Sequence, residues 1–356
     1  MSQPQPQPSP QTHSQPLVWF ITGCSSGFGL HLSLLALQNG HHVIATSRNP
    51  SKTPHLVTQV ESLGGVWHTL DVSAPESVLE EKVKEAMDVW GRIDVLVNNA
   101  GYALLGAFEC FRSVFSSHLL SRFSNVISTF VCQTRSLPRF AKRNTPRHYL
   151  IIDTHPTSEA ETLLQLRTNT FGPLTLTRLL IPHFRTRRSG TIIQISSVTG
   201  FEARASRSLY SASKFALEGF SEGLYNEMKP FGVRVLIVEP GAFNSEFPAK
   251  VVSHEREMLE DYRGGNVELM MGGVQKLRSE KGGGGGARND VRKGVQAIWD
   301  VVMRTGLAEG MKEEFLRLPL GKDAAERWEI VDDLRRRTLE GTRKIWESCE
   351  LDLKDE

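Results

Sequence analysis

Three side chains within one short stretch could together move a proton to or from an alcohol. Tyr210 and Lys214 are four residues apart, so on a helix they project from one face, one turn apart. A free tyrosine has a pKa of about 10, and a nearby ammonium group favours the phenolate and lowers that pKa. The apolar run 191–195 is followed by two serines, of which Ser197 is the second. We expect the Ser197 hydroxyl to face the substrate oxygen that exchanges a proton with Tyr210. A Tyr-x-x-x-Lys pair occurs by chance in many helices, so the surrounding elements decide its meaning.

The composition indicates a globular chain without a charge-driven partner. Its 356 residues, 39% hydrophobic and 23% charged, fit one large domain or two small ones. A formal net charge of +2 favours neither nucleic acid nor an anionic membrane as a partner. Cys24, Cys110, Cys132 and Cys349 lack metal-ligand spacing, so we expect reduced thiols, no metal and a cytoplasmic protein. No apolar run approaches the roughly 20 residues of a membrane span, and the Gln/Pro-rich residues 1–16 are typical of a disordered tail.

A glycine-rich turn joins a short predicted strand to a helix near the N-terminus. The apolar run 17–21 is followed by TGCSSGFG at residues 22–29, and a helical pattern then continues to Asn39. Glycines in this context let the backbone approach a pyrophosphate at the helix N-terminus, whereas an isolated motif would be an ordinary Gly/Ser turn. The residues of this turn that we expect to contact a dinucleotide are Thr22, Gly23, Ser25, Ser26, Gly27, Phe28 and Gly29.

The end of the second predicted strand, residues 42–46, indicates which dinucleotide is bound. An acidic residue at this place bonds the adenosine ribose, whereas an arginine accommodates a 2′-phosphate. Here Ser47 stands where the acid would be, and Arg48 follows it. We therefore expect NADP, with NAD as the alternative if Arg48 is only a solvated surface charge.

Further strands are predicted at residues 66–70, 93–97 and 233–238, and helices alternate with them. This alternation predicts an α/β protein with a doubly wound parallel sheet (Rossmann fold), formed by one domain over residues 17–321. Each polar motif directly follows a strand, at the sheet edge where such folds bind ligands. The motifs add these residues to the expected cofactor site: Asp71, Val72, Asn98, Ala100, Gly101, Pro240, Gly241 and Ser245.

Several motifs in this order resemble the classical short-chain dehydrogenases/reductases. They are TGxxxGxG at residues 22–29, NNAG at 98–101, Ser197, and Tyr210-x-x-x-Lys214. RNPSK at 48–52 and RLPLGKDA at 317–324 look like relatives grouped with the 17β-hydroxysteroid and retinol dehydrogenases. The resemblance implies an NADP(H)-dependent alcohol dehydrogenase or ketoreductase that transfers hydride between nicotinamide and a carbonyl or secondary alcohol of a lipophilic small molecule.

The resemblance also implies a role for each catalytic position. Tyr210 would exchange the proton, while Lys214 would lower its pKa and bond the nicotinamide ribose, so both also belong to the cofactor site. Ser197, rather than its neighbour Ser196, would bond the substrate oxygen. Asn169 matches the family's asparagine that holds a helix bend and a proton-relay water, although an ordinary solvated helix asparagine is the alternative. Ser245 replaces the usual Thr that bonds the carboxamide of nicotinamide.

Residues 110–157 break the family pattern. The segment contains no Asp or Glu before Asp153 and lacks a helical or strand period, and a capping box at Ser158–Glu161 then begins a helix over residues 162–184. It is either a basic surface insertion or translated non-coding sequence, and we favour the second. If it displaced the helix that carries Asn169, the chain would be a catalytically impaired dinucleotide-binding protein, which is the alternative function.

The C-terminal third is expected to bind the substrate and close the sheet. Residues 243–289 resemble the family's mobile substrate loop and include a pentaglycine linker. A helix at 290–304, an edge strand at 315–321 and a charged helical tail at 322–356 follow, and a solvated helix face is preferred over nucleic-acid binding for the tail. Phe215, Gly219, Leu224 and Met228 are interpreted as one apolar helix face for the core or a subunit contact, which leaves a homo-oligomer open.

Overall fold

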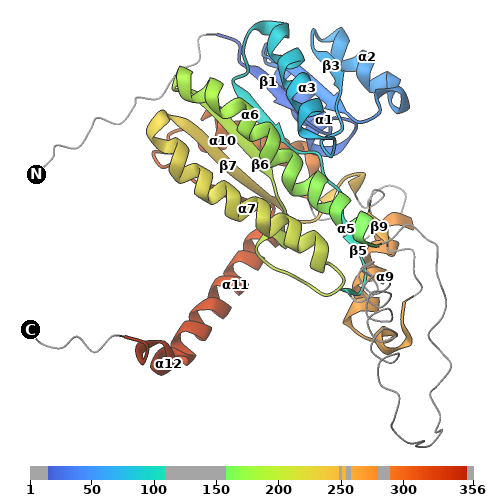
Figure 1. The fold of residues 1–356 in the computed structure, drawn as a ribbon, viewed down its shortest axis with the longest axis vertical. Coiled ribbons are helices and arrows are strands. Elements are labelled where there is room, and N and C mark those ends of the chain that lie inside the picture. Colours follow the sequence, from blue (N-terminus) through green and yellow to red (C-terminus); the bar gives the residue numbers. More distant parts are fainter. Residues whose placement is uncertain (1–14, 109–157, 248–250, 254–257, 280–288, 351–356) are drawn as a thin grey trace, which may run out of the picture.

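The computed structural model describes residues 15–108, 158–247, 251–253, 258–279 and 289–350 (Figure 1). Three predictions lie outside these residues. They concern the N-terminal tail over nearly all of its length, the 110–157 segment and the pentaglycine linker. The capping role of the Ser158 side chain also lies outside what is described.

Seven parallel strands form the central sheet in the order β11-β7-β6-β4-β1-β2-β3. The strands are β1 (Val18–Ile21), β2 (His42–Ser47), β3 (Val66–Thr69), β4 (Val95–Asn98), β6 (Gly190–Ile195), β7 (Val233–Pro240) and β11 (Arg317–Leu320). Each corresponds to a predicted strand, and the doubly wound parallel sheet is confirmed. Strands buried on both faces read as continuous apolar runs, which explains why short segments were recognisable in the sequence.

Helices cover both faces of the sheet, and alternating residues of β1 separate the two cores. Trp19 and Ile21 pack with α1 (Gly27–Gln38), α2 (Pro54–Ser62) and α10 (Val291–Met303). On the opposite face, Val18 and Phe20 pack with a second group of helices, α3 (Glu76–Trp90), α6 (Gly172–Arg187) and α7 (Ser208–Met228). Figure 1 shows α6 and α7 crossing the same side of the sheet. The two cores hold the carboxyl ends of the parallel strands along one edge of the sheet.

The helix predicted over residues 162–184 is divided by a π-helical turn. It comprises α5 (Ser158–Leu166), the turn Arg167–Phe171 and α6. Pro173 stands in the first turn of α6, where its missing N–H costs least. The Thr170 hydroxyl donates to the Ser213 carbonyl oxygen at 2.9 Å and ties the turn to α7. Asn169 therefore lies at the centre of the π-helical turn.

Two short parallel ladders lie within or against the predicted substrate loop. β5 (Leu104–Leu105) pairs with β9 (Val252–Ser253), and β8 (Phe243–Asn244) pairs with β10 (Asn289–Asp290). The loop also contains α9 (Asn266–Ser279), a helix that the sequence analysis did not predict. The adjacent glycines Gly272 and Gly273 conceal its periodicity, because glycine is unfavourable inside helices.

The predicted apolar face of α7 is wrong in part. Leu224 and Met228 are buried in the core, but Phe215 is 42% exposed and Gly219 is also exposed. Phe215 and Leu224 are nine residues apart, which is two and a half turns at about 3.6 residues per turn, so they lie on opposite sides of the helix. Only the C-terminal pair faces the sheet.

The last strand, β11, lies at one edge of the sheet, and the chain then leaves the sheet as a helical tail. Among the described strands, β11 pairs with β7 alone, and Pro319 lies opposite Glu239. The predicted charged tail is helical, as α11 (Lys322–Gly341) and α12 (Arg343–Glu347). In Figure 1, α11 runs away from the sheet with α12 at its far end. Ala324 is its buried residue, in the first turn, so α11 contacts the domain chiefly where it begins.

Candidate active site

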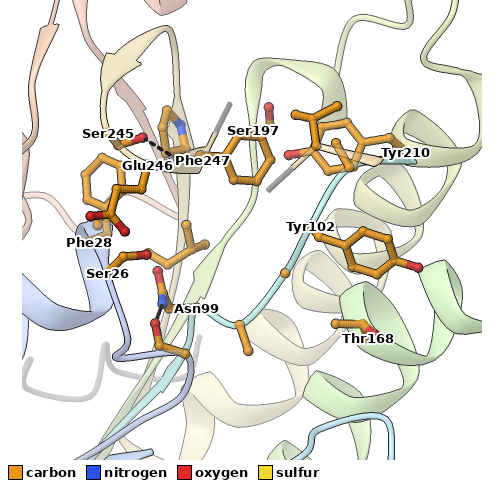
Figure 2. A pocket seen from close by; sticks show the side chains of 18 of the residues that line it. Ser26, Phe28, Asn99, Tyr102, Thr168, Ser197, Tyr210, Ser245, Glu246 and Phe247 are labelled. Carbon is orange, nitrogen blue, oxygen red and sulfur yellow. Dashed lines mark hydrogen bonds between the residues drawn. The ribbon is translucent and has the colours of Figure 1, made fainter. Parts of the chain in front are cut away.

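A cavity of about 1370 Å³ opens at the carboxyl ends of the strands. It lies where the strand order reverses between β1 and β4, the position at which open α/β sheets bind ligands. Most of the predicted site residues line it: Gly23, Ser25, Ser26, Gly27, Phe28, Arg48, Asp71, Val72, Ala100, Gly101, Ser197, Tyr210, Lys214, Pro240, Gly241 and Ser245. In Figure 2, Ser197, Tyr210 and Phe247 gather at one end, while Ser26 and Asn99 mark the glycine-turn side.

The glycine turn approaches the β4 end closely. Gly23 and Gly27 adopt positive φ values of 73° and 59°, a conformation that side chains disfavour. A Cβ on Gly29 would lie 2.5 Å from the Asn99 Nδ2 atom and 2.8 Å from the Gly23 carbonyl oxygen. The glycines are therefore required by a turn folded tightly on itself, and they leave backbone atoms exposed to the cavity.

Three predicted cofactor residues do not line the cavity. The Thr22 hydroxyl accepts from the Asn99 and Ala100 amides at 2.9 and 3.0 Å. Asn98 is buried and donates to the Thr177 hydroxyl oxygen at 3.0 Å. Together with Gly29, these residues shape the turn instead of facing a ligand. Asn99, which the sequence analysis did not single out, does line the cavity and holds the Thr22 and Gly23 carbonyl oxygens at 2.8 and 3.1 Å.

Cations gather at the end of β2. Arg48 and Lys52 both line the cavity and are exposed to solvent. The Ser47 hydroxyl accepts from the Trp67 indole N–H at 3.1 Å, so Ser47 is buried against β3. Asp71 accepts from the Ser73 amide and hydroxyl at 2.9 and 2.7 Å and shapes the chain after β3. Lys52 was missed, because a lone lysine in a sequence is indistinguishable from a solvated one.

Tyr210 lies near the start of α7 and is 6% exposed. Burial raises the pKa of Tyr210, while the Ser197 hydroxyl, the Arg207 guanidinium and the Thr199 hydroxyl lower it. The expectation that Lys214 would bring the Tyr210 pKa below 10 does not describe this structure, because desolvation outweighs the favourable interactions. Tyr210 is therefore held as the neutral phenol, the form that donates a proton.

Lys214 is 4% exposed, and its Nζ donates to the Ile195 carbonyl oxygen at 2.7 Å. Burial lowers the pKa of Lys214 to about 8, although the Glu218 charge acts in the opposite direction. A Cβ on Gly101 would lie 3.6 Å from Lys214 Nζ and 3.2 Å from Asn169 Oδ1. The absence of a side chain at Gly101 thus keeps space open between the two polar groups.

We expect Lys214→Met to stabilise the fold while removing catalysis. The lysine pKa is about 10.5 when unfolded and about 8 when folded, so below pH 8 folding must desolvate a charge. At pH 7 the free energy of unfolding of the variant should be up to about 3 kcal/mol higher than that of the parent protein. This difference should shrink as pH rises from 8 to 10.5. Urea unfolding of both proteins across this range measures it; a variant less stable at every pH would contradict it.

The two serines after β6 face different partners. The Ser197 hydroxyl accepts from the Thr199 amide at 3.2 Å and lies beside Tyr210. The Ser196 hydroxyl donates to Glu218 Oε1 at 2.5 Å, so it is occupied by a buried carboxylate. This arrangement supports the choice of Ser197 over Ser196 for substrate contact.

A cluster of charged side chains, Arg317, Glu218 and Glu239, lies next to the serine turn. Arg317 donates to Glu218 and, at 2.8 Å, to Glu239, whose other oxygen accepts from the Trp328 indole at 2.6 Å. Burial and the Glu218 charge raise the pKa of Glu239 to about 7. Because Glu218 also holds Ser196, the cluster connects β11 and α11 to the serine turn.

Asn169 is fully buried in the π-helical turn and does not line the cavity. Its Nδ2 donates to the Tyr102 carbonyl oxygen at 2.9 Å and to the Ser213 hydroxyl at 3.0 Å, and its Oδ1 accepts from the Tyr102 amide at 3.1 Å. The solvated-asparagine alternative is therefore wrong. Asn169 fixes the chain after Gly101 to α7, and the helix that carries it is intact.

The segment after β7 completes the cavity wall. Ser245 lines it, and its hydroxyl accepts from the Phe247 amide at 3.3 Å. The Ala242 amide donates to Asp323 Oδ2 at 2.7 Å, which attaches this segment to α11. RLPLGKDA thus contributes Asp323 to a wall of the site.

A doubly wound sheet with a glycine turn at its switch point defines an α/β protein of the dinucleotide-binding class. The short chain dehydrogenase family model matches residues 17–146 and 152–256. The chain is 36% identical over 230 residues to oxidoreductase claN of Passalora fulva, covering 64% of this chain and 83% of that protein. It is 30% identical over 243 residues to retinol dehydrogenase 8 of Homo sapiens, covering 67% and 62%. A short-chain dehydrogenase structure from Streptomyces avermitilis superposes with a TM-score of 0.72 at 30% identity, covering 95% and 100%.

The chain therefore belongs to the short-chain dehydrogenase family and is an oxidoreductase of that family. The resemblance to a group with retinol dehydrogenase-like members is confirmed. In the described part of the chain, no helix combines the length and apolar composition that crossing a bilayer requires.

Proposed function

We propose that the protein is an NADP(H)-dependent ketoreductase or alcohol dehydrogenase that acts on lipophilic carbonyl compounds. The observation that carries this proposal is the convergence of Ser197, Tyr210 and Lys214 on the cavity that the glycine turn also borders. When bound there, the nicotinamide supplies or accepts the hydride. The chain's own residues would supply the proton and hold the reacting oxygen.

In the reducing direction, the Tyr210 hydroxyl gives its proton to the carbonyl oxygen as hydride reaches the carbonyl carbon. The Ser197 hydroxyl donates a hydrogen bond to that oxygen as negative charge develops on it. The Lys214 ammonium stabilises the Tyr210 phenolate that remains, and Asn169 holds the Gly101 segment beside them. One hydride and one proton together convert the carbonyl into the alcohol, and the reverse steps oxidise it.

The cavity fits a dinucleotide together with a lipophilic substrate. Backbone atoms exposed by Gly23 and Gly27 can approach a pyrophosphate, and Arg48 with Lys52 can neutralise a 2′-phosphate. Near Tyr210 the wall includes the apolar residues Leu105, Phe247 and Val251. The volume of about 1370 Å³ exceeds the range of about 300–1,000 Å³ typical of a single small-ligand pocket.

The test of this proposal is NADPH oxidation with a panel of hydrophobic ketones and aldehydes. Turnover of at least one compound, lost in Tyr210→Phe, would support it. Binding of NADPH without turnover of any compound would favour the impaired dinucleotide-binding protein instead, although the intact packing of Asn169 argues against that outcome. Cytoplasmic location and a homo-oligomer stay predictions.

Arg48→Ala should weaken NADPH binding by about 10- to 100-fold and NADH binding by less than about threefold, because only NADPH presents a phosphate to the guanidinium. Parallel titrations of both cofactors measure the difference. Arg185→Ala is the matched control, since Arg185 is exposed on α6 and does not line the cavity. Equal weakening of both cofactors would show that Arg48 does not read the phosphate.

A further inference from the structure

Arg207 lies near Tyr210, the proposed proton donor, at the end of the cavity where we place the substrate. Arg207 occupies the N-cap position of α7, three residues before Tyr210, and both line the cavity. The preceding residue, Ser206, adopts a positive φ of 64°, which is uncommon for a non-glycine residue. Its carbonyl oxygen accepts from the Gly106 amide at 2.9 Å, so the strained turn is anchored. The backbone therefore holds Arg207 at a fixed place near Tyr210.

Arg207 differs from the other arginines of this wall. Arg204 and Arg327 also line the cavity, but each forms an ion pair with Glu202 at 3.1 Å. Within the described residues, Arg207 forms no ion pair, and its Nε is buried without a hydrogen-bond partner. Glu202 acts on Arg207 electrostatically, but this carboxylate is already paired with Arg204 and Arg327. Arg207 thus carries a charge that no ion pair within the described residues neutralises.

This arrangement is unfavourable unless a ligand completes it. Burial lowers the pKa of the Arg207 guanidinium, yet arginine does not lose its proton in proteins, so the charge stays. An anion bound in the cavity would offset this charge through the guanidinium N–H groups that line it. The fork of a guanidinium matches a carboxylate with two parallel hydrogen bonds. Leu105 and Phe247 supply apolar surface to the same cavity near Tyr210, and the Phe247 ring lies 6.1 Å from the Tyr210 ring.

We propose that Arg207 binds a carboxylate carried by the carbonyl substrate, so that the enzyme acts on lipophilic keto acids or hydroxy acids. The inference rests on the proposed function, because it places the substrate carbonyl at Tyr210. Arg207 would then fix the acid group across the first turn of α7 and select which carbonyl of a molecule meets the proton donor. Neutral ketones would still enter through the apolar wall but would bind more weakly.

The test uses ortho-, meta- and para-acetylbenzoate and their methyl esters, which vary the distance between ketone and charge. Binding is measured by calorimetry with and without NADP⁺. At least one acid should bind about 10- to 100-fold more tightly than its ester, because a charge-assisted bidentate contact is gained. Arg207→Gln should abolish this preference, and Arg207→Lys should keep part of it. The thermal midpoint of Arg207→Gln should change little, because the guanidinium has no hydrogen bond or ion pair with the described residues to lose.

Arg204→Gln is the matched control, since it removes the same charge from the same wall. It should change the acid-to-ester ratio by less than about threefold, because Glu202 already neutralises Arg204. Equal binding of all acids and esters, or a preference that survives in Arg207→Gln, would overturn the inference. NADPH oxidation with the methyl esters tests the proposed function separately, since they lack the charge. Turnover of the esters without any preference for acids would leave the function standing and remove only the role of Arg207.

Discussion

Tyr210→Phe should lower kcat by at least about 1,000-fold while NADPH affinity stays within about threefold. General acid catalysis contributes roughly 100- to 10,000-fold, and burial keeps Tyr210 in the protonated form that donates. The substitution removes one oxygen atom and retains the ring that packs against Phe247, so the cavity wall should persist. Steady-state ketone reduction together with NADPH titration measures both quantities.

Two other tyrosines serve as controls for this loss. Tyr225 lies on the same helix but away from the cavity, so Tyr225→Phe should leave kcat within about twofold. Tyr102 lines the cavity, and burial, with the Glu161 charge, raises its pKa to about 12. If Tyr102→Phe removed turnover and Tyr210→Phe did not, the proton donor would be wrongly assigned.

Gly172→Ala should destabilise the fold by roughly 2–4 kcal/mol, because overpacking against an immobile neighbour forces the backbone to move. A Cβ on Gly172 would overlap the carbonyl oxygen of Val72 and lie 3.1 Å from that of Arg167. Both neighbours are backbone atoms that no rotamer change can displace. Val72 lines the cavity, so the same substitution should also weaken NADPH binding. Urea unfolding and cofactor titration of the variant measure the two effects.

The matched control is Gly223→Ala in α7, where a Cβ would meet nothing within 4 Å. Alanine is favoured over glycine in helix interiors, so this variant should gain about 0.5–1 kcal/mol. If the two substitutions had similar effects, the close approach of the π-helical turn to Val72 would not be what requires glycine at position 172.

The parts of the fold that the sequence predicts are those that local pattern determines. Apolar runs such as 191–195 ended in polar motifs at the correct places, because a buried parallel strand must be apolar on both faces. Two helices were missed for lack of such a pattern. α2 buries one residue, Val60, and α9 contains two adjacent glycines. The two interpretations of residues 110–157 stay predictions, because the segment lies outside the described residues.

The features of the site also divide into those that local sequence pattern predicts and those that depend on tertiary packing. Tyr210 and Lys214 follow from spacing along one helix, but the direction of the Tyr210 pKa depends on burial contributed by distant segments. Thr22 and Asn98 were expected to face the cofactor because they belong to a motif, yet their side chains hold the β1 and β4 ends together. Arg207 has no distinguishing sequence pattern. Its importance appears only when its partners, and those of Arg204, are compared.

The proline in β11 has a consequence for how the protein avoids aggregation. The Ile237 and Gly241 amides donate to the Leu316 and Leu320 carbonyl oxygens, so even-numbered positions of β11 face β7. Pro319 therefore points its nitrogen toward the open edge, where an incoming strand would need an N–H donor that proline lacks. A short edge strand interrupted by proline is a poor template for another chain. This edge therefore resists growth of the sheet into neighbouring molecules.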